Sequence, residues 1–127
     1  LSEISPGTVV LADEETLMFG LFGKKTPSLS MKDAQAELAK DRSIVLLDVR
    51  TKDEHKNGHI KGSVNVPLER LPVSITQKVP NKQAKLFVYC LSGSRSSQAC
   101  SWLMKNGYEN VTNLGGITAW PGVIVRG

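Results

Sequence analysis

From residue 28 onward, stretches with a helical spacing of apolar positions alternate with short, continuous apolar runs. Met31 to Lys40 has helical spacing with Ser30 placed as its N-cap, and residues 44–49 form an apolar run typical of a buried strand. The same signals predict strands over 63–66, 85–89 and 110–114 and helical segments over 51–57, 67–71 and 98–106. Strands that alternate with helices predict an α/β fold with a mainly parallel sheet and helices on both faces.

Proline and glycine mark the expected loops. Pro72 and Pro80 predict a loop between the helical turn that ends at Leu71 and the next strand. Gly115 and Gly116 predict a turn that leads to Trp120.

Residues 1–27 are predicted to form an N-terminal extension of unclear role, ahead of a domain that spans residues 28–127. One strand is expected at 8–11, followed by three acidic residues and a segment rich in Gly and Phe at 19–23. One interpretation is that the segment after Met18 is a natural start. The first seventeen residues would then be foreign to the protein or belong to a larger parent protein. The alternative is an extra edge strand that packs on the domain.

The segment from Val88 to Ser97 places a cysteine between a strand and a helix. Cys90 follows the predicted strand 85–89 and opens a loop of mostly small or polar residues, Leu91, Ser92, Gly93, Ser94 and Arg95. Ligands bind at the carboxyl edge of parallel sheets, and N–H groups at a helix N-terminus favour an anion or a thiolate there. The sequence therefore predicts a reactive Cys90 surrounded by backbone donors.

Arg95 adds a positive charge five positions after Cys90, and cationic neighbours lower the pKa of a thiol. We therefore interpret Cys90 as a nucleophile for an anionic or electrophilic substrate, and expect it to be exposed and to be alkylated faster than Cys100. Cys100 falls on the inner face of the predicted helix near Leu103 and is expected to be inert. A buried structural cysteine is the alternative for Cys90, although such a cysteine has no need of this loop.

Composition limits the classes of protein and of partner. The 127-residue chain, 40% hydrophobic and 22% charged, fits one globular domain. The net charge of +4 attracts small anions, but the Lys and Arg residues are scattered, so we expect no nucleic-acid partner. No apolar run is long enough to span a membrane, and no membrane partner is expected.

Cysteine usage favours a free thiol. Cys90 and Cys100 fall in a loop and inside a helix, which argues against a disulfide, and with two histidines they provide no adequate zinc ligand set. We therefore expect no metal and no cofactor, and a reducing, cytoplasmic location.

Several separated motifs resemble those of a rhodanese domain when they are taken in order along the chain. They are Leu47 to Arg50 with Glu54, Gly58 to Pro67, the loop that begins at Tyr89 and Cys90, and Leu114 to Trp120. The resemblance spans roughly residues 28 to 122. It implies the rhodanese fold, a five-stranded and mainly parallel sheet flanked by helices. It also implies a sulfurtransferase that carries sulfane sulfur as a persulfide on the loop cysteine, the position held by Cys90.

The resemblance further implies a small anionic sulfur donor such as thiosulfate and a thiol or cyanide as acceptor, with a protein sulfur acceptor as a further candidate partner. Loop N–H groups from Leu91 to Arg95 would hold the charged sulfur, and Arg95 would steer the donor and stabilise the departing charge. Ser92 and Ser94 are expected to serve the geometry of the turn rather than to contact substrate.

Two other functions are weighed against sulfur transfer. Protein tyrosine phosphatases use a C-x5-R loop, whereas Arg95 gives C-x4-R here, and Ser96 at the next position lacks the fork of donors that clamps phosphate. A phosphatase or arsenate reductase is therefore the minor alternative, for which Asp48 and Asp53 are the unassigned candidate acids. The other alternative is a non-enzymatic interaction module, although rhodanese-like modules without activity typically lack the cysteine.

Three further residues, Asp48, Arg50 and His59, are expected to support the site. Asp48 ends a buried strand, so we interpret Asp48 and Arg50 as a structural ion pair or hydrogen-bond network. His59 is interpreted as a hydrogen-bonding residue at the sheet edge, with a general base as the alternative. Trp120 is interpreted as a core residue, with the wall of the pocket as the alternative.

Overall fold

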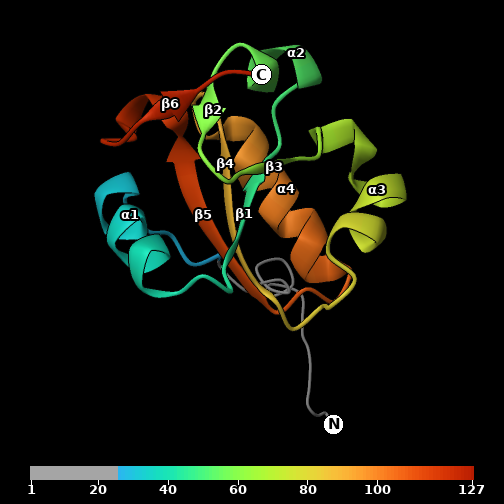
Figure 1. Cartoon of the computed structure of the whole chain (residues 1–127). Helices are drawn as coiled ribbons and strands as arrows, with labels where there is room; N and C mark the ends of the chain where they lie inside the picture. Colours follow the sequence, from blue (N-terminus) through green and yellow to red (C-terminus); the bar gives the residue numbers. More distant parts are fainter. Residues whose placement is uncertain (1–25) are drawn as a thin grey trace, which may run out of the picture.

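Four parallel strands form the central sheet in a computed structural model that describes residues 26–127 (Figure 1). The sheet order is β3-β1-β4-β5, with bounds Val64–Asn65, Val45–Asp48, Lys85–Cys90 and Asn110–Gly116. The predicted parallel α/β sheet is confirmed. The strand expected at 8–11 lies outside the described residues.

The sheet has four strands where the resemblance implied five. At the β5 edge, Ser28 makes a single parallel bridge with Asn113, supported by N–H donation from Leu29 to Asn113 and from Asn113 to Pro27. Pro27 has no N–H to donate, and a helix begins three residues after Ser28. This fifth segment is therefore limited to one bridge.

A second, two-stranded sheet was not predicted. In it β2 (His59–Ile60) pairs antiparallel with β6 (Ile124–Val125). Figure 1 shows this small sheet over the carboxyl end of β5, with α2 (Lys52–Lys56) and the C-terminus side by side at the top of the molecule. The Gly127 N–H donates to the Lys56 carbonyl at 2.9 Å, which fixes the end of the chain there.

The first two helices begin where the sequence predicts. α1 spans Met31–Lys40, and the Ser30 hydroxyl accepts a hydrogen bond from the Asp33 N–H. In α2, Thr51 and Glu54 form a reciprocal capping box that satisfies two free N–H groups at the helix start.

The third helix corrects the sequence interpretation, which placed a loop between Leu71 and the strand at 85. A short 3-10 turn, η1 (Leu68–Arg70), leads directly into α3 (Leu71–Lys78). Pro72 lies in the first turn, where a missing N–H costs no helical hydrogen bond. Leu71 and Ile75, four residues apart, are buried on one face.

α4 spans Ser94–Lys105, so it starts before Ser96 rather than after it. Gly93 is its N-cap in a left-handed conformation with φ of 107°, which favours glycine. A second 3-10 turn, η2 (Ile117–Ala119), follows β5 and leads to Trp120.

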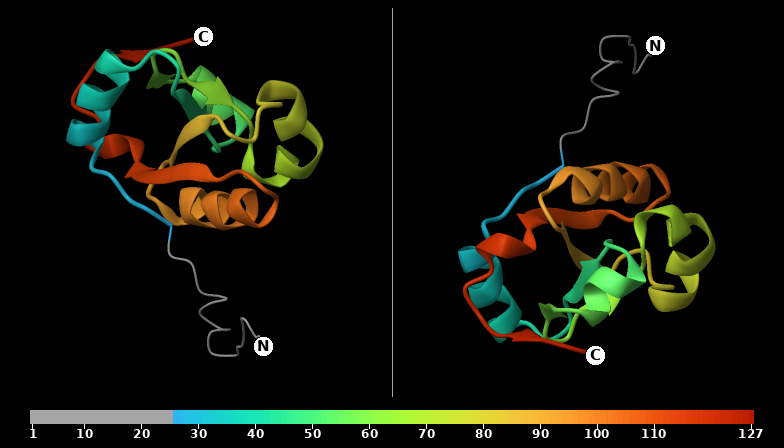
Figure 2. Two further views of the ribbon diagram at one scale, coloured as in Figure 1. Left: turned by 90° about the horizontal axis from the view of Figure 1, so that it is seen from below. Right: turned by 90° about the horizontal axis from the view of Figure 1, so that it is seen from above.

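Helices cover both faces of the sheet, as predicted (Figure 2). On one face α3 and α4 pack on Leu47, Val88 and their neighbours through Ile75, Leu103 and the Cys100 side chain. On the other face α1 packs on Leu46, Phe87 and Tyr89, with Trp120 at the edge of that cluster. Within residues 26–127, no helix has the length and apolar character needed to cross a membrane.

Candidate active site

Cys90 is the last residue of β4 and lies directly ahead of the N-terminus of α4. Only Leu91, Ser92 and Gly93 separate the strand from the helix. The predicted order of strand, loop and helix is therefore present, with a tighter loop than expected because Ser94 and Arg95 already belong to α4.

Hydrogen-bond donors surround the Cys90 sulfur. The Gly93 N–H donates to Sγ at 3.0 Å, and the N–H groups of Ser92 and Ser96 also favour the thiolate. Burial by itself raises the pKa of the Cys90 thiol, but hydrogen bonds from the Ser96 hydroxyl and from these three N–H groups outweigh it and hold the pKa below its ordinary value. The surroundings therefore favour the nucleophilic form.

The structure corrects the expectation that Cys90 is exposed. Its exposed fraction is 1%, whereas Leu91 on the same loop is 45% exposed. Cys100 is buried as predicted, and burial together with the Cys90 charge raises its thiol pKa to about 12. Both cysteines are free, and the difference between them lies in the donors around the sulfur rather than in exposure.

Ser96 is a site residue that the sequence interpretation missed. Its fully buried hydroxyl donates to the Gly93 carbonyl at 3.0 Å and also reaches the Cys90 sulfur. Because a hydroxyl has one proton, it can serve the carbonyl or the thiolate at any one time. The signal in the sequence is a Ser in the first turn of the helix after the cysteine, which the sequence-based interpretation uses only as an argument against phosphate binding.

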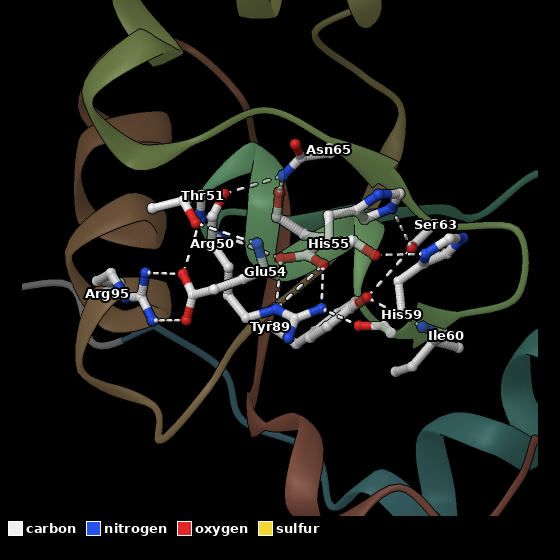
Figure 3. Close-up of polar contacts among 12 residues, drawn as sticks. Arg50, Thr51, Glu54, His55, His59, Ile60, Ser63, Asn65, Tyr89 and Arg95 are labelled. Atoms are coloured by element: carbon white, nitrogen blue, oxygen red, sulfur yellow. Dashed lines mark hydrogen bonds and ion pairs between the residues drawn. The ribbon is translucent and has the colours of Figure 1, made fainter. Parts of the chain in front are cut away.

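Arg95 does not point freely into solvent. Figure 3 shows its guanidinium paired with the Glu54 carboxylate, through Nη1–Oε1 and Nη2–Oε2 contacts of 2.7 and 3.0 Å. Hydrogen bonds from Arg95 hold the pKa of Glu54 at about 2, although partial burial acts in the opposite direction. Glu54 thus serves both the α2 capping box and Arg95, and it connects α2 to the Cys90 loop.

The end of β5 lies against the loop. Gly116 is the register partner of Cys90, and a Cβ on Gly116 would approach the Leu91 carbonyl oxygen to 2.4 Å. Gly116 has φ of −97°, which any residue can adopt, so contact with the loop, not backbone strain, requires glycine here. This contact fixes where the loop runs.

Asp48 and Arg50 form the predicted ion pair behind the site. Arg50 Nη2 lies 2.7 Å from Asp48 Oδ2, and both side chains are buried. Arg50 also donates to the Gly58 carbonyl at 2.7 Å, and Asn65 donates to the Asp48 and Arg50 carbonyls (Figure 3). These bonds join the ends of β1 and β3 to the loop before β2.

His59 stacks on His55, with ring centroids 3.7 Å apart. His59 Nδ1 donates to the His55 carbonyl at 2.7 Å, and His55 Nε2 lies 3.2 Å from the Ser63 hydroxyl, which accepts from Tyr89. Burial raises the pKa of the Tyr89 hydroxyl to about 12. His59 therefore lies in β2 of the small sheet, where its ring makes a hydrogen bond to the backbone.

The donors around one thiol suit chemistry on an anionic sulfur. In residues 26–127, no group of three or more His, Cys, Asp or Glu side chains is arranged to hold a metal ion. A thiolate at a helix N-terminus can attack an electrophilic atom, and the same N–H groups can hold the negative charge of the product.

Comparison with known proteins gives a consistent result. Residues 30–122 match the rhodanese-like domain family. A sulfurtransferase of Allochromatium vinosum is 40% identical over 84 residues, which cover 65% of this chain and 77% of that protein. Thiosulfate sulfurtransferase PspE of Escherichia coli is 37% identical over 71 residues, covering 56% and 68%. The solved structure of a rhodanese with anions from E. coli superposes with a TM-score of 0.63 at 33% identity, covering 66% of this chain and 99% of that one.

Proposed function

The chain belongs to the rhodanese-like domain family, and on that basis we propose that it is a sulfurtransferase that carries sulfur as a persulfide on Cys90. The observation that carries the proposal is the cluster of N–H and hydroxyl donors around a buried thiol at the start of α4. The relatives named as sulfurtransferases support the same class of reaction.

The proposed reaction is a double displacement. The Cys90 thiolate attacks the outer sulfur of a donor such as thiosulfate, a new S–S bond forms, and the donor S–S bond breaks as sulfite leaves with the electron pair. An acceptor such as cyanide or a thiolate then attacks the terminal sulfur of the persulfide. The electron pair of the broken bond returns to Cys90, which regenerates the thiolate.

The loop is proposed to hold negative charge throughout this cycle. The N–H groups of Ser92, Gly93 and Ser96 stabilise the thiolate before transfer and the persulfide after it. Arg95 is proposed to attract the anionic donor and to stabilise the departing sulfite. Its charge is partly compensated by Glu54, so the fixed N–H groups carry most of the stabilisation.

Asp48, Arg50 and His59 are proposed to support the site rather than to take part in the transfer. Their side chains are bonded to one another or to backbone groups. The interaction-module alternative has no comparable support, since it leaves the lowered pKa of the Cys90 thiol without a role.

Two single substitutions test the proposal. Cys90→Ser is expected to abolish the formation of thiocyanate from thiosulfate and cyanide, while Cys100→Ser retains most of it because Cys100 is held as a neutral thiol in the core. Loss of activity in Cys100→Ser with retention in Cys90→Ser would reject the proposal, as would full activity in both.

A further inference from the structure

A basic groove of about 490 Å³ lies beside the end of β3. Its rim carries Lys52 at the start of α2, Arg70 at the end of η1 and Lys78 at the end of α3, all exposed. In the described part of the chain, the residues that line this groove include no carboxylate. The groove therefore gathers positive charge from three separate elements.

These cations are not neutralised by their surroundings. Within residues 26–127, neither Lys52, Arg70 nor Lys78 forms an ion pair. The adjacent carboxylates in the sequence, Asp53 and Glu69, are exposed and do not line the groove. Like charges that face one recess without partners favour an anionic occupant.

The spacing of the cations favours an extended occupant over a small anion. Arg70, the N-cap residue of α3, lines the groove together with Ser74 and Lys78 of the helix. The three positions are four residues apart, so they follow one side of the helix. The eight steps from Arg70 to Lys78 correspond to a rise of about 12 Å along a helix. About four residues of extended peptide cover that distance, so such a peptide can meet cations at both ends of the groove.

The floor of the groove suits a peptide better than a nucleic acid. Val66 is buried and Pro67 is half-buried at the groove, and no aromatic side chain lines it in the described residues. Single-stranded nucleic acids bind through aromatic stacking as well as through charge. An apolar floor with a charged rim fits a peptide that carries apolar and acidic side chains.

The groove adjoins the Cys90 site across the sheet. Asn65, which lines the groove, pairs with Asp48 on β1, and Asp48 pairs with Tyr89, the residue before Cys90. Two strand spacings separate β3 from β4, a distance of about 10 Å. α2 joins the two places, because Lys52 lines the groove and Glu54 holds Arg95.

We propose that this groove binds an acidic segment of a protein sulfur acceptor and thereby holds that acceptor beside the Cys90 loop. The inference rests on the proposed sulfur transfer for the identity of the partner. The binding of an acidic peptide to the groove is inferred independently of the proposed sulfur transfer.

Binding is tested by titrating the 15N-labelled protein with a short peptide of glutamates around a central leucine, observed by NMR. The amide signals of Asn65, Arg70 and Ser74 are expected to shift with this peptide and not with a matched peptide in which glutamine replaces glutamate. The triple variant Lys52→Gln, Arg70→Gln, Lys78→Gln is expected to weaken binding roughly tenfold at low ionic strength.

A matched variant controls for net charge. Lys32→Gln, Lys40→Gln, Lys105→Gln removes the same charge from exposed positions on α1 and α4, outside the groove, and is expected to retain binding. Equal weakening in both triple variants would reject a specific groove. Shifts that occur elsewhere, or tighter binding of a single-stranded oligonucleotide, would reject an acidic peptide as its occupant.

Sulfur transfer then separates this inference from the proposed function. A cysteine added to the acidic peptide is expected to take sulfur from the persulfide faster than one in the glutamine peptide, and the groove variant is expected to lose that advantage. Persulfide formation without any preference for the acidic peptide would reject the groove and leave the sulfurtransferase intact. Binding of the peptide without persulfide formation would reject both the sulfurtransferase and the role of the groove in sulfur acceptance.

Discussion

The guanidinium of Arg95 is joined to the carboxylate of Glu54 by two hydrogen bonds, 2.7 and 3.0 Å long. These residues are separated by 41 positions in the sequence, and their contact ties α2 to the start of α4. The pair also bears on the Cys90 site, because the negative charge of Cys90 adds to that of Glu54 in raising the pKa of the Arg95 guanidinium.

Glu54→Gln should lower the pKa of the Cys90 thiol slightly, because it leaves the Arg95 charge uncompensated. Gln preserves the capping box, so α2 should keep its start. The pH dependence of alkylation by iodoacetamide reports the thiol pKa. Asp53 is an exposed carboxylate on the same helix, so Asp53→Asn is the matched control, and it should change the thiol pKa less. An unchanged midpoint in Glu54→Gln would contradict this account of the pair.

Ser96→Ala should raise the pKa of the Cys90 thiol, because the hydrogen bond from the Ser96 hydroxyl to the thiolate is lost. Ser96→Thr keeps the hydroxyl and should restore most of the shift. The same alkylation profile measures both variants. If Ala and Thr give the same profile, the hydroxyl does not act on the sulfur.

Gly116→Ala should reduce sulfur transfer strongly, because the new Cβ would meet the Leu91 carbonyl and displace the loop. Gly115→Ala is the comparison: no atom lies within 4 Å of its added Cβ, but its φ of 82° disfavours alanine. Gly115→Ala should therefore lower the melting temperature and keep the thiol pKa, whereas Gly116→Ala should change the thiol pKa. Equal thiol pKa values in both variants and the wild type would show that the β5 contact does not position the loop.

Because of His55, the free energy of unfolding should fall in mild acid. Burial, together with the charge of His59, lowers the pKa of His55 below its usual value. The folded state therefore favours neutral His55, and the unfolded state takes up more protons below about pH 6.5, so stability falls as the pH drops through that value. Denaturant unfolding at several pH values between neutral and mildly acidic should show a shallower decline for His55→Gln than for the wild type. An equal decline in His55→Gln and in the wild type would show that other groups cause the loss of stability.

The elements that were predicted correctly have strong local signals. The apolar run at 44–49 and the Ser30 and Thr51 caps led directly to β1, α1 and α2. β2 and β6 have two residues each, too few to show a period, and their pairing joins positions more than 60 residues apart. α3 was missed because Pro72 is a loop signal in sequence, while in the structure it occupies the first helical turn.

The features of the candidate site also divide into those that local sequence predicts and those that it does not. Cys90 follows from the order of strand, loop and helix, which is local in sequence. The pairing of Arg95 with Glu54 cannot be predicted in this way. Glu54 belongs to one of the motifs that resemble a rhodanese domain, but nothing local in the sequence links α2 to α4. The burial of Cys90 was also missed, since the packing that covers the sulfur depends on β5 and α4 together.

The central claim is that Cys90 carries the transferred sulfur. The most direct test is to incubate the protein with thiosulfate, digest it with a protease, and measure the masses of the peptides. The account predicts one added sulfur atom on the peptide that contains Cys90, none on the peptide that contains Cys100, and loss of that sulfur as thiocyanate when cyanide is added. An unmodified Cys90 after incubation, or an adduct that persists in Cys90→Ser, would contradict it.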